Sequence, residues 1–170
     1  SGETVRGDLF IDCSGEQATL IGDTLSVEHE DWSSWQPWDT VLTARSSRPG
    51  DLPPYTTVKA HELGWLRQIP LRHGFHNELV FSSAHVSKDQ AALAFESALG
   101  AAQTGDMSTR TQAAGPRKAF WKANCVALGR AAGEFGTTEI SELDMAQRGV
   151  MRLATLLPNR DCNPLIAAEF

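Results

Sequence analysis

One stretch decides the fold of this chain: FWKANCVALGRAAG, which runs from Phe120 to Gly133. Its apolar centre, Cys125 to Leu128, is long enough for a buried strand and too short for a helix. The glycines that follow, starting with Gly129, predict a turn and then a helix start. In α/β sheets, ligands bind beyond the carboxyl ends of strands, where small residues let the backbone approach a cofactor. The pattern fits either a ligand-binding turn or an ordinary strand–turn–helix connection.

The composition predicts a globular protein that binds neither nucleic acid nor a membrane. The chain has 170 residues, of which 41% are hydrophobic and 21% charged, and a formal net charge of -6. This acidic balance argues against nucleic-acid and anionic-membrane surfaces. No apolar run reaches membrane-spanning length, and we expect no signal peptide. The three cysteines lie far apart, at positions 13, 125 and 162, which favours reduced thiols and a cytoplasmic location over disulfides or a zinc site.

Periodicity and turn residues predict the other elements. Alternation favours a strand over Thr4 to Ser14, and a short helix is expected over Glu16 to Leu25. Trp32 opens a set of three tryptophans at three-residue spacing, which fits either a stack on an aromatic ligand or a helical turn on the body of the fold. Further strands are predicted at 41–44, 55–61, 64–71, 78–83 and 107–114, and helices starting at Ser87, at Glu139 (to Leu157) and at Asn163-Pro164.

Four stretches together resemble the flavin-dependent tryptophan halogenase family, in the order that the family has. They are DLFIDCSG from Asp8, PPYT from Pro53, AHELGWLRQIPL from Ala60, and FWKANCVALG from Phe120. The resemblance implies a mixed α+β and α/β structure, part of a two-domain, FAD-dependent monooxygenase-like fold. It divides the chain into the end of the FAD-binding sheet with its helix (1–25), a substrate-side antiparallel sheet with a helix (26–115), and a strand–turn with a long helix on the FAD and halide side (116–170).

The resemblance covers only the middle of the family's longer chains. No GxGxxG fingerprint occurs here, and the stretch that would carry the family's essential lysine is missing as well. We therefore expect either part of a longer protein or a true fragment that pairs with a partner chain or with itself. Turnover by these 170 residues alone is not expected.

The resemblance implies halogenation of tryptophan or another electron-rich, indole-like aromatic, with reduced FAD, O2 and chloride or bromide. A separate flavin reductase would supply the FADH2. Glu139 falls on the family's catalytic glutamate, whose anion would stabilise positive charge on the attacked ring. Without the resemblance, Glu139 is an ordinary glutamate in the first turn of a helix, where the helix dipole favours it.

The resemblance also assigns residues to the halide and the flavin. Ser141 and Glu142 fall on the halide pocket, although a carboxylate repels an anion unless it points away. Leu143 falls on the residue that touches FAD, and Gly129 and Arg130 lie at the FAD edge. Arg130 replaces an apolar or small residue and would either bind a phosphate or cap the turn toward solvent.

The family's Trp-x-Trp-x-Ile-Pro signature stands here as WLRQIP, from Trp65 to Pro70. Trp65, Ile69 and Pro70 are kept and are expected at the substrate pocket, whereas Arg67 replaces the second tryptophan. A guanidinium can stack on an aromatic ring and pair with an acid, but it is a poor hydrophobic screen. Arg67 and Glu142 therefore favour an alternative function, that of a flavin-dependent aromatic monooxygenase.

The remaining polar residues suggest no other chemistry. Glu16 stands where the family usually carries an aromatic residue, so we expect different packing there. His61 and His73 have no second ligand at metal spacing, and we expect structural roles and no metal. No Gly-x-Ser-x-Gly or Ser-His-Asp pattern supports a hydrolase. Three hypotheses remain: a halogenase-like enzyme, an aromatic monooxygenase, and a truncated non-catalytic fragment or split-chain partner.

Overall fold

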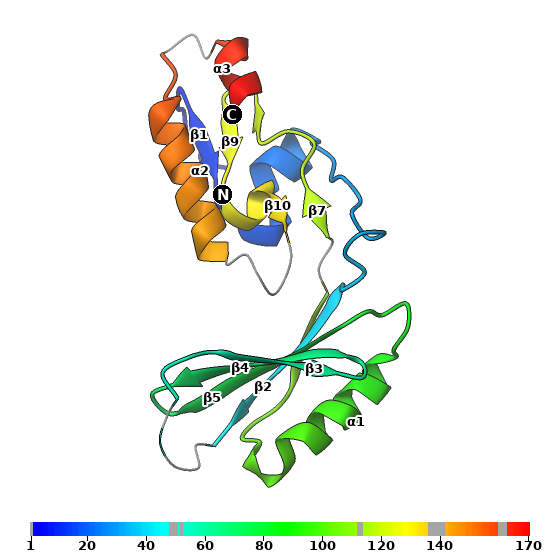
Figure 1. Ribbon diagram of the computed structural model, residues 1–170. Coiled ribbons are helices and arrows are strands. Elements are labelled where there is room, and N and C mark those ends of the chain that lie inside the picture. The colour runs from blue at the N-terminus through cyan, green and yellow to red at the C-terminus, as the bar shows by residue number, and fades with distance from the viewer. Residues whose placement is uncertain (1, 48–50, 52, 112–113, 136–141, 160–162) are drawn as a thin grey trace. The chain divides into compact units, whose positions relative to one another are not determined.

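The computed structural model describes residues 2–47, 51, 53–111, 114–135, 142–159 and 163–170. The chain forms two compact units (Figure 1). One unit combines Ser1–Asp31 with Gly115–Phe170, and the other is the continuous segment Trp32–Ala114. Within the ranges described, none of the helices has the length and apolar character needed to cross a membrane.

Two distant parts of the chain meet in a parallel strand pair at the centre of the first unit. Phe10 lies opposite Cys125, and Asp12 opposite Ala127. A third strand pairs antiparallel with the strand that contains Cys125. Two further strands form a separate antiparallel sheet. The predicted strand after Asn124 is confirmed, whereas the long strand predicted from Thr4 is confined to its last few residues. The strands are β1 (Phe10–Asp12), β7 (Gly115–Pro116), β8 (Trp121–Lys122), β9 (Cys125–Ala127) and β10 (Gly133–Glu134).

The helical segments of this unit are η1 (Gly15–Gln17), η2 (Thr19–Thr24), η4 (Gly129–Ala132), α2 (Glu142–Thr155) and α3 (Pro164–Glu169). The single helix predicted from Glu16 to Leu25 is wrong, because Ala18 has a left-handed φ of 43° and separates a 3-10 turn from a π-helical one. The long helix predicted from Glu139 is confirmed from Glu142 onward.

The buried carboxylate of Asp12 holds the start of η2. Its Oδ2 accepts the backbone N–H groups of Leu20 and Ile21, at 2.9 and 2.8 Å, and its Oδ1 accepts the N–H and the hydroxyl of Ser14, at 3.0 and 2.6 Å. The first turn of a helix has N–H groups without partners in the helix itself, and this side chain supplies acceptors for two of them. Asp12 therefore links the end of β1 to the helical segment that follows.

Both faces of β9 are buried, as its uninterrupted apolar sequence predicts. Cys125 and Ala127 pack in one apolar cluster with Ile21 of η2 and Ala131 of η4. Val126 alternates to the other face, where it packs with Leu153 of α2 in a cluster that also holds Trp121 and Leu128. The strand is thus enclosed between the short helical segments and α2.

The second unit is a five-stranded antiparallel sheet in the order β3-β4-β5-β2-β6, with one long helix. The predicted meander of three consecutive strands is confirmed, with the last strand starting at Gly74 rather than at Glu78. The elements are β2 (Thr40–Ser46), β3 (Thr57–His61), β4 (Gly64–Leu71), β5 (Gly74–Phe81), α1 (Lys88–Leu99), η3 (Gly100–Ala102) and β6 (Ser108–Thr111).

Helix α1 covers one face of this sheet. It begins at a capping box, in which the Ser87 hydroxyl accepts the Gln90 N–H and the Gln90 side chain accepts the Ser87 N–H. Its Phe95 packs with Leu79 and Leu42 of the sheet, and Leu66 of β4 packs against the same cluster. Because side chains alternate along a strand, the residues on either side of Leu66 belong to the opposite face, which none of the helices described in this unit covers.

Candidate functional site

Two glycines fix the turn that follows β9. Gly129 has a left-handed φ of +61°, and a Cβ there would lie 3.9 Å from the Ala146 Cβ, an ordinary contact. Its backbone conformation, rather than the space around it, requires glycine. A Cβ on Gly133 would lie 2.5 Å from the Cα of Pro116, so the close approach of β7 requires glycine there.

Arg130, the next residue after Gly129, contacts carboxylates from three separate elements. Its Nη2 lies 2.5 Å from Oε1 of Glu16 in η1. Its Nε lies 3.1 Å from Oε1 of Glu142, the first residue of α2, and 3.4 Å from Oε2 of Glu134 in β10. We call these four residues the Arg130 cluster. The structure thus brings together Arg130 and Glu142, which the resemblance assigned to the flavin and to the halide, and it surrounds the arginine with acids.

Glu134 is the member of the cluster that the sequence did not reveal. Its side chain is buried, with 8% of the residue exposed. Burial raises the pKa of its carboxyl above the ordinary value; Arg130 opposes this rise, and the carboxylates of Glu142 and Glu16 add to it. Nothing local in the sequence marks Glu134 as a buried acid, because burial comes from its pairing with β7.

A small cavity of about 20 Å³ lies against the cluster. Its volume suits a single water molecule. With three carboxylates around one guanidinium, two negative charges are in excess when all four groups are ionised. That excess makes the cavity a poor site for an anion. The lining residues are Gly129, Arg130, Gly133, Glu134, Phe135, Glu142 and Met145.

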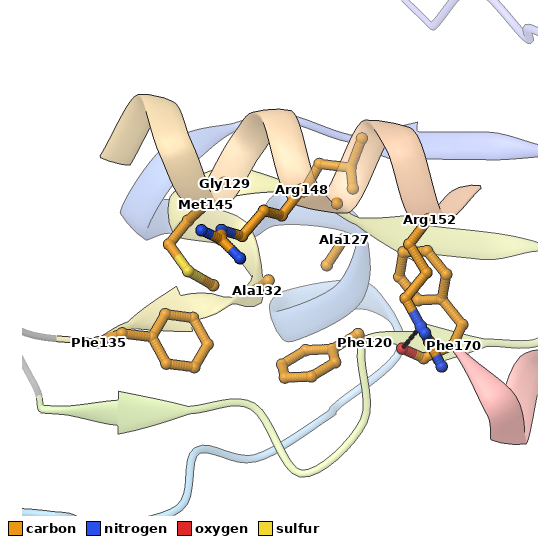
Figure 2. A pocket seen from close by; sticks show the side chains of 11 residues that line it. Phe120, Ala127, Gly129, Ala132, Phe135, Met145, Arg148, Arg152 and Phe170 are labelled. Carbon is orange, nitrogen blue, oxygen red and sulfur yellow. Dashed lines mark hydrogen bonds between the residues drawn. The ribbon is translucent and has the colours of Figure 1, made fainter. Parts of the chain in front are cut away.

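A larger and apolar cavity of about 180 Å³ lies under α2. Figure 2 shows the rings of Phe120 and Phe135 on the side opposite the helix, with Met145 extending from α2 toward Phe135. Arg152 closes one end, where its Nε donates to the carbonyl of Phe170 at 3.2 Å. The full lining is Phe120, Ala127, Leu128, Gly129, Ala132, Phe135, Met145, Arg148, Gly149, Arg152 and Phe170.

The residues predicted to contact the flavin differ in which of these two cavities they line. Gly129 lines both cavities, whereas Arg130 lines only the small, charged one. Leu143, which the resemblance assigns to the flavin, lines neither and is 77% exposed. Glu139 and Ser141 lie in residues 136–141, outside the part of the chain that the structure describes.

In the second unit, the kept signature residues lie along β4. Trp65 packs edge-on against Trp38, with ring centroids 4.4 Å apart. By alternation Ile69 shares the helix-free face with Trp65, and Pro70 belongs to the other face. Proline is tolerated there because the pairing of β4 with β3 ends at Gln68, so no N–H is needed on that side.

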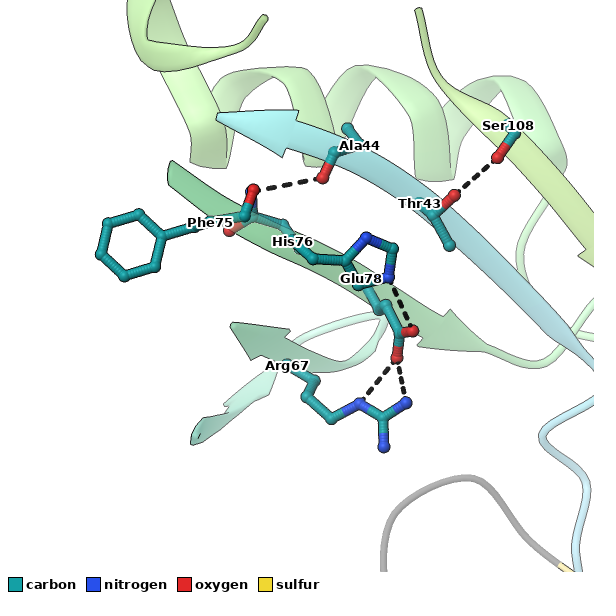
Figure 3. A network of polar contacts seen from close by, with 8 residues as sticks. Thr43, Ala44, Arg67, Phe75, His76, Glu78 and Ser108 are labelled. Atoms are coloured by element: carbon teal, nitrogen blue, oxygen red, sulfur yellow. Dashed lines mark hydrogen bonds and ion pairs between the residues drawn. The ribbon is translucent and has the colours of Figure 1, made fainter. Parts of the chain in front are cut away.

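Arg67 is paired within its own sheet. It lies directly opposite Glu78 of β5, and its Nε donates to Glu78 Oε2 at 2.6 Å (Figure 3). The other oxygen of Glu78 lies 3.0 Å from Nε2 of His76. The positive charge of Arg67, which replaces the family's second tryptophan, is therefore neutralised by the Glu78 carboxylate on the neighbouring strand. Only the strand register shows that these two residues pair.

Other candidate residues have local structural roles. Trp32 starts a single helical turn, in which its carbonyl accepts the N–H of Trp35 at 2.9 Å, and the Trp35 side chain is exposed. The backbone from Trp32 to Trp35 thus forms the helical turn of one interpretation, and with the Trp35 ring exposed the stacking of an aromatic ligand stays a prediction. Nδ1 of His61 accepts the Leu63 N–H at 3.2 Å in the β3–β4 turn. Among the residues that the structure describes, no three His, Cys, Asp or Glu side chains gather as metal ligands.

The chain resembles known proteins over its whole length. The family model described as tryptophan halogenase matches residues 1–170. The tryptophan 7-halogenase KtzQ from Kutzneria sp. (strain 744) is 30% identical over 175 residues, which cover 100% of this chain and 33% of that protein. The tryptophan 6-halogenase SttH from Streptomyces toxytricini is 25% identical over 171 residues, which cover 98% of this chain and 32% of that protein. The chain thus spans about a third of the length of the curated relatives it matches.

Solved structures of halogenases share the fold. BrvH, a flavin-dependent halogenase from Brevundimonas sp. BAL3, is 40% identical with a TM-score of 0.92, covering 99% of this chain and 35% of that one. A flavin-dependent halogenase from Xanthomonas campestris is 36% identical with a TM-score of 0.92, covering 99% of this chain and 34% of that one. The mixed α and β fold predicted from the resemblance is therefore confirmed.

Proposed function

We propose, because this chain belongs to the tryptophan halogenase family, that the protein halogenates tryptophan or another electron-rich aromatic molecule. One observation carries the proposal: both sequence and fold match flavin-dependent halogenases from end to end of the chain. The proposed co-substrates are chloride or bromide, O2 and FADH2 from a separate flavin reductase. When bound, reduced FAD supplies the reaction with O2 that oxidises the halide.

The described residues fit the flat ring of a flavin better than its phosphates. The cavity under α2 lies at the carboxyl end of β9 and is lined mainly by aromatic rings and small apolar residues. Such a surface suits a flat aromatic group. Arg130 is surrounded by acids, and the excess negative charge opposes a phosphate. We therefore propose Gly129 for the ring and do not assign Arg130 to a phosphate. Leu143 lies outside this cavity, and its proposed contact with the flavin is supported by the resemblance alone.

Glu139 is the proposed catalytic residue. Addition of electrophilic halogen to an indole carbon gives a cationic ring, which then loses the proton from the same carbon. A fixed carboxylate next to the ring stabilises that cation more than it stabilises the neutral substrate. Ser141 is proposed to donate a hydrogen bond to the halide. Glu142 is less suited to the halide, because Arg130 holds its carboxylate within the charged cluster.

The helix-free face of the second unit's sheet is the proposed wall for the aromatic substrate. Trp65 and Ile69 contribute apolar surface there, and Pro70 shapes the end of the strand. Arg67 does not bring a net charge to this wall, since Glu78 pairs with it. The pairing removes the main reason to prefer an aromatic monooxygenase.

The test uses the complete protein with a purified flavin reductase, NADH, FAD and bromide, and tryptophan and indole as substrates. We expect brominated product, recognised in mass spectrometry by the paired isotope pattern of bromine. Hydroxylated product that forms equally without bromide would support the monooxygenase, and flavin oxidation with no product would support a non-catalytic protein.

A variant of the proposed catalytic residue sharpens this test. Glu139→Gln keeps the size of the side chain and removes the anion, and we expect the bromination rate to fall about 100-fold while flavin binding is retained. Glu96→Gln makes the same change at an exposed position of α1 and should leave the rate unchanged. Equal rates for both variants would remove Glu139 from the mechanism.

A further inference from the structure

We propose that Arg130 is a positioning residue that holds both ends of the connection carrying Glu139. In sequence, residues 136–141 join β10 to α2, and the cluster contains Glu134 from the strand before them and Glu142 from the helix after them. The geometry of the cluster stands by itself. Its consequence for catalysis rests on the role proposed above for Glu139.

A single nitrogen joins the two flanking elements. Nε of Arg130 lies 3.4 Å from Oε2 of Glu134 and 3.1 Å from Oε1 of Glu142. The other end of the guanidinium contacts Glu16 in the turn after β1. The planar guanidinium carries five N–H donors in a rigid fork and can serve several acids at once, whereas a lysine ammonium is a point charge on a flexible stem. Arg130 is thus suited to hold three elements in one arrangement.

The elements that Arg130 joins are themselves fixed. β10 lies so close to β7 that a Cβ on Gly133 would clash with Pro116. Helix α2 packs on the turn after β9, where a Cβ on Gly149 would lie 2.8 Å from Cδ2 of the Leu128 side chain. The guanidinium therefore joins two elements that are each packed against a neighbouring part of the same unit.

Charge makes the arginine necessary for this arrangement. Without it, the carboxylates of Glu16, Glu134 and Glu142 would repel one another. We expect the first turn of α2 to move away from β10. A displacement of about 1 Å in a catalytic group can cost about 100-fold in rate, so a small shift at these flanks is enough to impair Glu139.

The test compares variants of the complete protein. Arg130→Met alone would leave Glu134 buried without a cation and could prevent folding, so it is combined with Glu134→Gln. Lys118→Met is the matched control, because it removes an exposed ion pair with Glu28, 2.6 Å long, elsewhere in the same unit. We expect the double variant to lose about tenfold or more in kcat for bromination, with KM for the aromatic substrate and flavin affinity changed less than about threefold. The control should match the wild type.

Amide hydrogen exchange gives a readout that does not need activity. Peptides containing Glu134 and Glu142 should exchange faster in the double variant, while peptides from β4 and β5 should not change. Unchanged exchange at both flanks would show that Arg130 does not hold them, whether or not the protein is active. A wild-type protein that makes no halogenated product contradicts, by that result alone, only the proposed function. In an active protein, an unchanged kcat, or a kcat loss matched by an equal loss of flavin affinity, overturns the positioning role.

Discussion

Glu16 and Arg130, 114 positions apart in the sequence, meet at 2.5 Å between Oε1 and Nη2. Each residue departs from what the family resemblance predicts at its position, an aromatic at 16 and a small or apolar residue at 130. The parallel pairing of β1 with β9 explains why they meet, because the turns after parallel strands emerge at the same edge of a sheet. In this chain the two departures are thus joined by one ion pair.

This ion pair predicts a measurable coupling. In a Glu134→Gln background, which avoids leaving a buried acid without its cation, Glu16→Gln and Arg130→Met should each lower the free energy of unfolding, and the protein with both changes should lose less than the sum of the two. Because both side chains are partly exposed, we expect a coupling of about 1 kcal/mol or less. Urea unfolding of the four proteins measures it, and additive losses would mean that the contact contributes nothing.

Glu134 should make stability depend on pH. Its pKa in the folded protein lies above the ordinary value of 4.5, chiefly because it is buried. The folded state therefore holds this proton more tightly than the unfolded state, and stability should fall as the pH rises from about 4.5 through the raised pKa.

Glu134→Gln removes this titration and should flatten that part of the stability profile. Thermal unfolding at several pH values checks the expectation. Glu96→Gln, at an exposed site, should leave the profile as it is. A wild-type profile that rises over this range would contradict burial as the dominant influence on Glu134.

Asp12 should act in the opposite sense. Burial alone would raise its pKa, but the hydrogen bonds from Ser14, Ile21 and Leu20 together bring it below the ordinary value of 3.8. Its contribution is present above that value and is lost as the pH falls below it. Asp12→Asn should cost about 1–3 kcal/mol at neutral pH, and the gap to the wild type should narrow in acid. Asp23→Asn, on the exposed side of η2, serves as the control.

Gly64 should be irreplaceable in the second unit. A Cβ at this position would lie 1.9 Å from the carbonyl oxygen of Val80 on the neighbouring strand. Gly64→Ala should therefore cost more than about 3 kcal/mol and split β4 from β5. Gly105 also has a positive φ, but its Cβ position is open, so Gly105→Ala should cost only about 1–2 kcal/mol of backbone strain. Equal costs would show that the contact with Val80 relaxes easily.

Local signals in the sequence predicted the parts of the fold that depend on local physics. The apolar run at Cys125 identified the central strand, and Ser87 identified the start of α1. The break at Ala18 was missed. Just after it, the N–H groups of Leu20 and Ile21 bond to Asp12 of the preceding strand, a contact that the local sequence does not show. No residue within a few positions of Ala18 predicts a break in the helix.

The same distinction between local and tertiary information applies to the candidate site. The residues of the halogenase signature could be located from sequence because they resemble a known pattern. The partners of the two arginines could not. Glu78 becomes the partner of Arg67 only through the register of β4 and β5, and Glu134 becomes a buried acid only through the pairing of β10 with β7. Charges that replace family residues indicate that a counter-charge is needed, but only the tertiary structure identifies it.

The arrangement of the two units has a consequence for synthesis on the ribosome. All strands of the five-stranded sheet come from the continuous segment Trp32–Ala114, so this unit can fold as soon as that segment has emerged. β1 emerges far earlier, yet it must wait for β9, 115 positions later, counted from Phe10 to Cys125. Until β9 has emerged, β1 lacks the strand with which it pairs in the folded unit, so this short segment depends on a contact that forms late in synthesis.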